Sequence, residues 1–69
     1  MNTFTVLLEH DDDAVLLERL LTENDIGYEC DVIGTDYLLY EFMINIENRK
    51  IVSLLLGYNN IKVVDFKSN

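Results

Sequence analysis

The spacing of apolar residues changes repeatedly along this 69-residue chain, and these changes of period limit the folds that it can form. From Thr3 to Glu9, every second residue is apolar and shares one face, which is the pattern of a half-buried β-strand. The period then lengthens to that of an amphipathic helix, whose apolar side holds Ala14, Leu17, Leu20 and Leu21. The first third of the chain therefore predicts a strand followed by a helix.

Alternation with a period of two returns after this helix, which Asn24 and Asp25 can end because both tolerate a left-handed conformation. A second strand has Tyr28, Cys30 and Val32 on one face. Residues 34–36, Gly-Thr-Asp, are typical of a hairpin turn. A third strand is therefore expected over residues 37–46.

The last part of the chain repeats the helix and strand patterns. Asn48 is expected to cap a second helix whose apolar stripe consists of Ile51, Leu54, Leu55 and Tyr58. A final strand follows at residues 61–66, and its inward face can hold either Ile61 and Val63 or Val64 and Phe66. The predicted order is strand, helix, strand, strand, helix, strand.

Two right-handed β-α-β units joined by a hairpin form a four-stranded antiparallel sheet of order 4-1-3-2 with both helices on one face. We therefore predict one α+β domain over residues 1–69 with the ferredoxin-like βαββαβ plan. No proline occurs, and no linker or repeat divides the chain. Thirteen side chains are expected in the core, namely Phe4, Val6, Leu8, Leu17, Leu21, Cys30, Leu38, Tyr40, Phe42, Ile44, Ile51, Leu54 and Tyr58.

The composition argues against several classes of protein. Thirteen acidic residues against five Lys and Arg give a formal charge of −8, which disfavours direct nucleic-acid binding. No apolar run reaches the ~20 residues of a membrane span, and no signal peptide is recognisable. The single cysteine cannot form an internal disulfide, so a reducing cytoplasm is the expected compartment.

Few residues could carry chemistry. Cys30 is expected in the core, where it acts as a small apolar residue, and the three isolated glycines form no phosphate-binding loop. The segment His10-Asp11-Asp12-Asp13 is interpreted as a helix N-terminus that an aspartate caps, with a weak cation site or a His10 general base as alternatives. We therefore predict no enzyme, no metal site and no cofactor.

Negative charge is concentrated in one part of the sequence. Residues 9–36 hold ten acidic residues and one basic residue, Arg19. The first helix crosses toward the edge strand, so an acidic flank is expected from Asp12, Asp13, Glu18, Glu23, Glu29 and Asp31. This flank could serve solubility, and the carboxylates on the edge strand could prevent aggregation. The alternative is a docking surface for a basic partner protein.

The sheet face away from the helices is unusually apolar. Its predicted residues are Leu7, Ile33, Tyr37, Leu39 and Met43, with Val64 and Phe66 as further candidates. A one-sided antiparallel sheet is normally polar on this face. A homodimer formed back to back is the simplest explanation, and a different partner protein is the alternative.

These features favour a small acidic protein that binds and antagonises a basic partner, such as a nuclease or another nucleic-acid-binding protein. The pattern of helices and strands also resembles that of small regulatory modules such as ACT domains. That resemblance implies a dimer that binds a small molecule between its subunits. Against it, the junction at residues 10–13 is acidic and has no glycine-bearing ligand loop.

Overall fold

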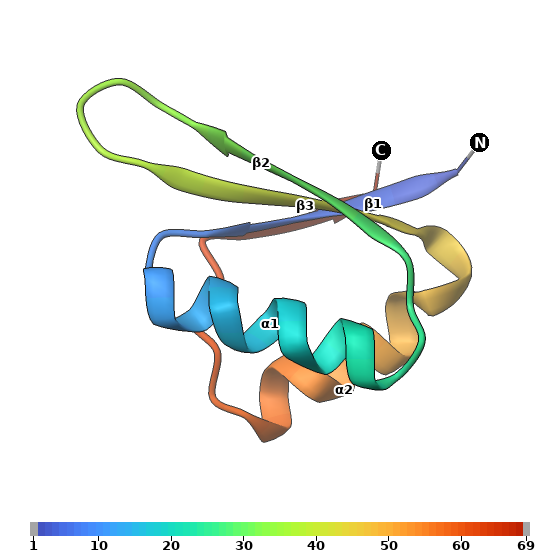
Figure 1. Cartoon of the computed structure of the whole chain (residues 1–69). Coiled ribbons are helices and arrows are strands. Elements are labelled where there is room, and N and C mark those ends of the chain that lie inside the picture. Colours follow the sequence, from blue (N-terminus) through green and yellow to red (C-terminus); the bar gives the residue numbers. More distant parts are fainter. Residues whose placement is uncertain (1, 69) are drawn as a thin grey trace.

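The computed structural model describes residues 2–68 and contains a four-stranded antiparallel sheet and two α-helices (Figure 1). Its elements are β1 (Thr3–Leu8), α1 (Asp11–Glu23), β2 (Tyr28–Ile33), β3 (Leu39–Asn45), the short 3-10 helix η1 (Ile46–Asn48), α2 (Arg49–Tyr58) and β4 (Asp65–Ser68). The prediction of a small α+β domain with this order of strands and helices is confirmed.

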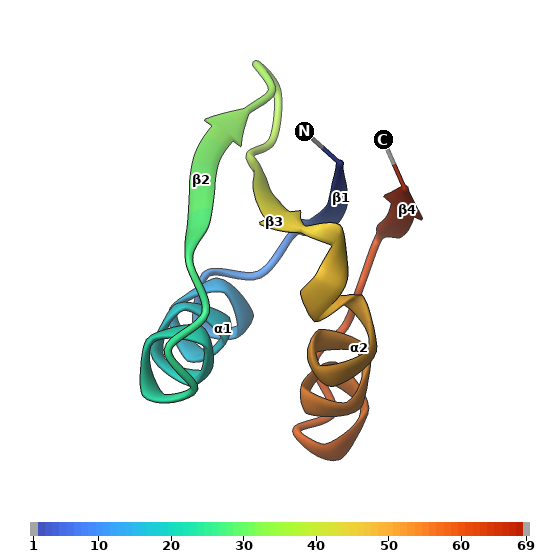
Figure 2. The ribbon, with the colours of Figure 1, turned by 90° about the vertical axis from the view of Figure 1, so that its right-hand side faces the viewer.

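The strands are arranged in the order β2-β3-β1-β4, so β2 and β4 are the two edges. Read from the β4 edge this is β4-β1-β3-β2, which gives each strand the neighbours that the sequence predicts. Both helices lie on the same side of the sheet, with α1 under its β2 side and α2 under its β4 side (Figure 2). No helix between residues 2 and 68 covers the opposite face, which is called the outer sheet face below.

The core lies between the sheet and the helices. Its buried apolar residues are Phe4, Val6, Leu8, Ala14, Leu17, Leu21, Ile26, Phe42, Ile44, Val52, Leu56 and Ile61. The Phe4 and Phe66 rings stack with centroids 5.2 Å apart. The rings of Tyr28 and Phe42 lie 5.7 Å apart, which joins β2 to β3 on the helical side.

The predicted buried stripe of the second helix is wrong. Ile51, Leu54 and Tyr58 are exposed, and the buried residues of α2 are Val52 and Leu56. Apolar residues occupy more than half of the circumference of this helix, so its period alone leaves the rotation undetermined. The Ile61 backbone N–H donates to the Leu56 carbonyl oxygen at 3.0 Å, and Ile61 is buried. This return of the chain turns Leu56 toward the sheet.

The hairpin between β2 and β3 extends beyond the helical layer (Figure 1). For this reason Leu38, predicted in the core, is 52% exposed, and Cys30 and Tyr40 are only half-buried. Tyr37, predicted on the outer sheet face, lies in the loop before β3 and is largely exposed. The third strand therefore begins two residues later than predicted.

The last strand also begins later than the sequence predicts, at Asp65. Phe66 is opposite Val6 and stacks on Phe4, so it faces the helices. Of the two predicted alternatives, the inward face is therefore the one that includes Phe66. Phe66 is thus not on the outer sheet face. Val64 lies before β4 and is exposed.

The helix caps differ from the predicted ones. His10 is the N-cap of α1 and makes no side-chain capping bond, so no aspartate caps this helix. Asn48 makes no capping bond either, whereas the Asn45 side chain accepts a hydrogen bond from the Glu47 N–H. The exit of α1 is as expected, with Asp25 in the left-handed region at φ 57°.

Replacing Gly34 by alanine is expected to destabilise the protein by about 1 kcal/mol or more. Gly34 has φ +109°, and a Cβ atom there would collide with the Tyr37 carbonyl oxygen. Gly27→Ala is the matched control, because a Cβ there meets nothing within 4 Å. Denaturant unfolding measures both variants, and equal midpoints for the two would show that the loop does not require glycine.

Candidate functional site

The outer sheet face is defined by the register of the strands. Phe4, Val6 and Leu8 of β1 are fully buried under the helices, so the alternate residues of β1 point the other way. The pairings carry this alternation across the sheet. The outer sheet face therefore consists of Thr3, Thr5, Leu7, Glu29, Asp31, Ile33, Leu39, Glu41, Met43, Asn45, Asp65 and Lys67.

Three carboxylates lie in one line across this face. Asp31 is directly opposite Glu41, Glu41 is opposite Leu7, and Leu7 is opposite Asp65. We call Asp31, Glu41 and Asp65 the acidic row. Like charges directly opposite each other on neighbouring strands lower stability. The pair of Asp31 and Glu41 therefore has a cost to folding.

Apolar side chains flank the acidic row. Leu7, Leu39 and Met43 are half-buried on this face, and Ile33 is 38% exposed. The next rung runs from Glu29 through Met43 and Thr5 to Lys67, and Thr5 is only 3% exposed. The outer sheet face is thus a mixed surface in which Leu7, Leu39 and Met43, called the aliphatic strip below, are interspersed with the carboxylates.

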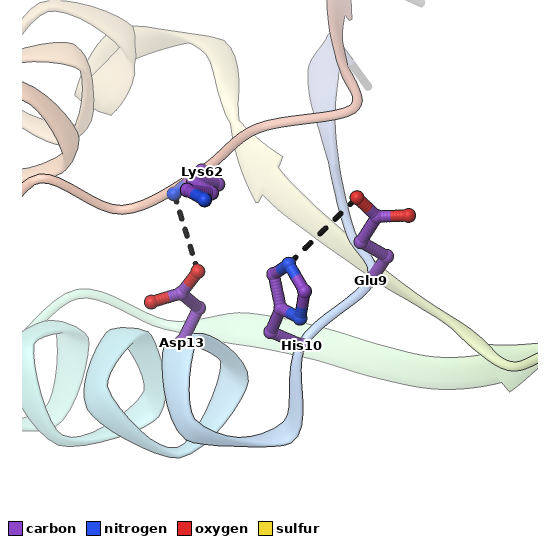
Figure 3. Close-up of polar contacts among 4 residues, drawn as sticks. All are labelled: Glu9, His10, Asp13 and Lys62. Atoms are coloured by element: carbon purple, nitrogen blue, oxygen red, sulfur yellow. Dashed lines mark hydrogen bonds and ion pairs between the residues drawn. The ribbon is translucent and has the colours of Figure 1, made fainter.

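The carboxylates are not neutralised by basic side chains. Among residues 2–68, the contact within salt-bridge distance joins His10 Nε2 to Glu9 Oε1 at 3.8 Å, and no Lys or Arg pairs with an acidic residue. Figure 3 shows His10 turned toward Glu9, and Asp13 turned toward Lys62. Within the described part of the chain, the acidic row is therefore not part of a salt bridge with Lys or Arg.

The structure divides the predicted acidic flank among several surfaces. Asp12 and Glu23 are exposed on α1, away from its buried side. The Asp13 carboxylate accepts a hydrogen bond from the Lys62 backbone N–H at 3.2 Å, so it faces the segment before β4. Glu18 accepts a hydrogen bond from the Tyr28 hydroxyl at 3.0 Å on the β2 side. The remaining two, Glu29 and Asp31, belong to the outer sheet face.

Two acidic residues of this face were not among the predicted site residues. Glu41 shares the alternation of Leu39 and Met43, so the strand pattern itself could have placed it there. Asp65 could not be placed, because the apolar residues before it fit either orientation of the last strand.

The environment of Cys30 keeps its thiol protonated. Burial raises the pKa of Cys30, and the carboxylates of Glu18 and Asp31 raise it further. Burial likewise raises the pKa of the Tyr28 hydroxyl, and its hydrogen bond to Glu18 adds to that rise. A reactive cysteine requires the opposite shift, toward the thiolate. Both shifts favour the neutral form of these two groups.

The region around His10 is open. Beneath the hairpin loop lies a hollow of about 460 Å³ lined by Glu9, His10, Asp11, Tyr37, Leu38 and Tyr40. In the part of the chain that the structure describes, no three His, Cys, Asp or Glu side chains are grouped so as to hold a metal ion. His10 and the three aspartates therefore do not converge on a common point.

Comparison with known proteins gives no relative from which a role could be transferred. No family model, no curated protein and no solved structure matches the chain. Between residues 2 and 68, neither helix has the length and apolar character needed to cross a lipid bilayer.

Proposed function

We propose that this protein is a non-catalytic binding module that docks its outer sheet face onto a basic surface of another protein. Occupying such a surface excludes its normal ligand, so the module acts as an inhibitor or antagonist. A nucleic-acid-binding protein or nuclease is the partner class that fits best, because its basic site is built to bind closely spaced negative charges.

The acidic row is the observation that carries this proposal. Asp31 and Glu41 are directly opposite each other on neighbouring strands, and no described Lys or Arg pairs with either. Solubility does not require this arrangement, because exposed residues on α1 such as Asp12 and Glu23 supply charge without cross-strand repulsion. A basic partner would remove the repulsion on binding.

The aliphatic strip supports a protein partner rather than a free cation. Leu7, Leu39 and Met43 offer apolar area beside the carboxylates, and protein interfaces combine apolar area with polar groups. A second copy of the chain fits this face poorly. Two copies face to face would bring two acidic rows together, with Lys67 as the one cation that each contributes to this face. We therefore favour a basic partner over the homodimer.

The arrangement of the elements supports two further parts of the proposal. The strand neighbours and the placement of both helices on one side support a ferredoxin-like fold. The alternative of a small-molecule sensor resembling ACT domains has less support. The hollow beside the β1–α1 junction is lined by Glu9 and Asp11, which would repel carboxylate and phosphate ligands.

Parallel affinity capture tests this function. The wild-type chain and a variant with Asp31→Asn, Glu41→Gln and Asp65→Asn are immobilised side by side and exposed to lysate of the source organism. We expect a basic protein that the wild type retains, that the variant does not, and that salt releases. Double-stranded DNA should compete if the partner binds nucleic acid. Retention of the same proteins by both baits would contradict the proposal.

A further inference from the structure

The free edge of β2 offers unpaired backbone groups to another strand. β2 is the outermost strand at its end of the sheet and pairs with β3 alone. Among residues 2–68, no other segment forms backbone hydrogen bonds with it. An edge strand of this kind binds an extended segment through its alternate N–H and C=O groups.

Exposed apolar side chains lie on α1 and on β2 near this edge. The Tyr28 hydroxyl donates to Glu18, so the flank of α1 that carries Glu18 faces β2. Val15 lies one turn before Glu18 on that flank and is 66% exposed. On the helical side of β2, Cys30 is half-buried and Val32 is 55% exposed. Apolar side chains of an added strand would cover these residues.

The opposite side of the same edge is acidic. Glu29 and Asp31 alternate with Cys30 and Val32 along β2, and both point to the outer sheet face. No described Lys or Arg is paired with either carboxylate. A strand added to β2 would therefore meet apolar groups on one of its faces and carboxylates on the other.

We infer that β2 binds an extended segment of the basic partner as a fifth strand, and that this segment alternates apolar and basic residues. The inference rests on the proposed function and specifies how the partner is recognised. Apolar residues of the segment cover Val15, Cys30 and Val32, and its basic residues pair with Glu29 and Asp31. Recognition thus combines main-chain hydrogen bonds with a charge pattern of period two.

Other occupants of this edge are less favourable. In a symmetric antiparallel pair of two β2 strands, the carboxylates Glu29 and Asp31 would meet those of the second copy. The second free edge, β4, is only four residues long and carries Lys67 beside Asp65, so it lacks the same charge pattern. A basic segment from another protein is the occupant that complements β2.

Binding of a synthetic peptide tests this inference. The probe is a short peptide of alternating lysine and valine with blocked ends, titrated into the full chain at low salt. We expect binding, together with slower hydrogen exchange at alternate backbone amides of residues 28–33. Two matched peptides carry N-methyl groups on one or the other set of alternate amides. One of them should bind about tenfold more weakly, because it cannot donate to β2.

Two outcomes would overturn the inference. One is the absence of binding by the unmodified peptide, and the other is equal binding by all three peptides, which would show recognition by charge alone. In the second case the capture experiment could still support the proposed function, so the two failures are distinguishable.

A pair of variants tests the apolar contacts independently. Val15→Ser should weaken binding of the unmodified peptide severalfold, because an exposed apolar contact on the β2 side is lost. Leu54→Ser is the control, since Leu54 is similarly exposed but lies on α2. Unchanged affinity in the Val15 variant, or an equal loss in both, would show that the peptide does not cover Val15.

Discussion

Replacing Phe42 by alanine is expected to lower the free energy of unfolding by about 3–5 kcal/mol, the usual loss for a buried aromatic side chain. Phe42 is fully buried, lies opposite Val6 of β1 and Cys30 of β2, and contacts the ring of Tyr28. It therefore touches both neighbouring strands at the centre of the core. A chain of this size has a small free energy of unfolding. Most molecules of the variant should therefore be unfolded at moderate temperature.

Denaturant unfolding followed by circular dichroism measures this loss. Met43→Ala is the control, because Met43 is the next residue of β3 but lies half-buried on the outer sheet face. Its substitution should cost clearly less. A Phe42 variant with the same unfolding midpoint as the Met43 variant would mean that the centre of the core lies elsewhere.

The strands that could be predicted well are those with one face in the core and one face in solvent. In β1 the alternation of Phe4, Val6 and Leu8 is uninterrupted, and all three side chains are fully buried. In β3 the same alternation places Phe42 and Ile44 inside. A slip of one residue would turn these side chains to the outer face, so pattern and register determine each other.

The orientation of α2 could not be predicted, because the helix carries two apolar stripes. One holds Ile51, Leu54 and Tyr58, and the other holds Val52 and Leu56. Local periodicity favours the first stripe, whereas the chain connections select the second. The short helix η1 sets how α2 begins, and the bond from Ile61 N–H to the Leu56 carbonyl sets how it ends. Both constraints lie in the chain next to the helix rather than in its apolar period. At the exit, Asn60 in the left-handed region followed by the apolar Ile61 is the local pattern of a helix C-cap, which the period alone does not register.

The residues of the candidate site could also be predicted only in part. Strand alternation placed Leu39 and Met43 on the outer sheet face, and the register shows both there. The acidic flank instead follows from the expected path of the first helix toward the edge strand, and that path does not distinguish the two sides of the helix. Asp13 and Glu18 consequently lie on opposite flanks of α1, one beside Lys62 and the other beside Tyr28.

Neutralising the acidic row is expected to raise stability and weaken partner binding at the same time. With Asp31→Asn, Glu41→Gln and Asp65→Asn, the free energy of unfolding should rise by about 0.2–1 kcal/mol, because a like-charge pair across two strands is removed. Asparagine at position 65 can still accept the local hydrogen bond from the Phe66 N–H. Denaturant unfolding measures this gain, and a loss of stability would show that the row is part of the structural framework.

The effect of the same substitutions on binding should be larger. Once a partner has been identified, association at low salt should slow by about tenfold or more, because the acidic row attracts the basic surface during encounter. A control variant with Asp12→Asn, Glu23→Gln and Asp25→Asn removes the same net charge from exposed residues in and just after α1. Stopped-flow or surface-based kinetics compares the two sets over a range of salt concentrations.

Equal slowing by both variants would mean that only the overall charge matters and that docking does not use the outer sheet face. Unchanged association in both would rule out docking through charge, whereas a clearly slower rate for the acidic-row variant alone would locate the contact on this face.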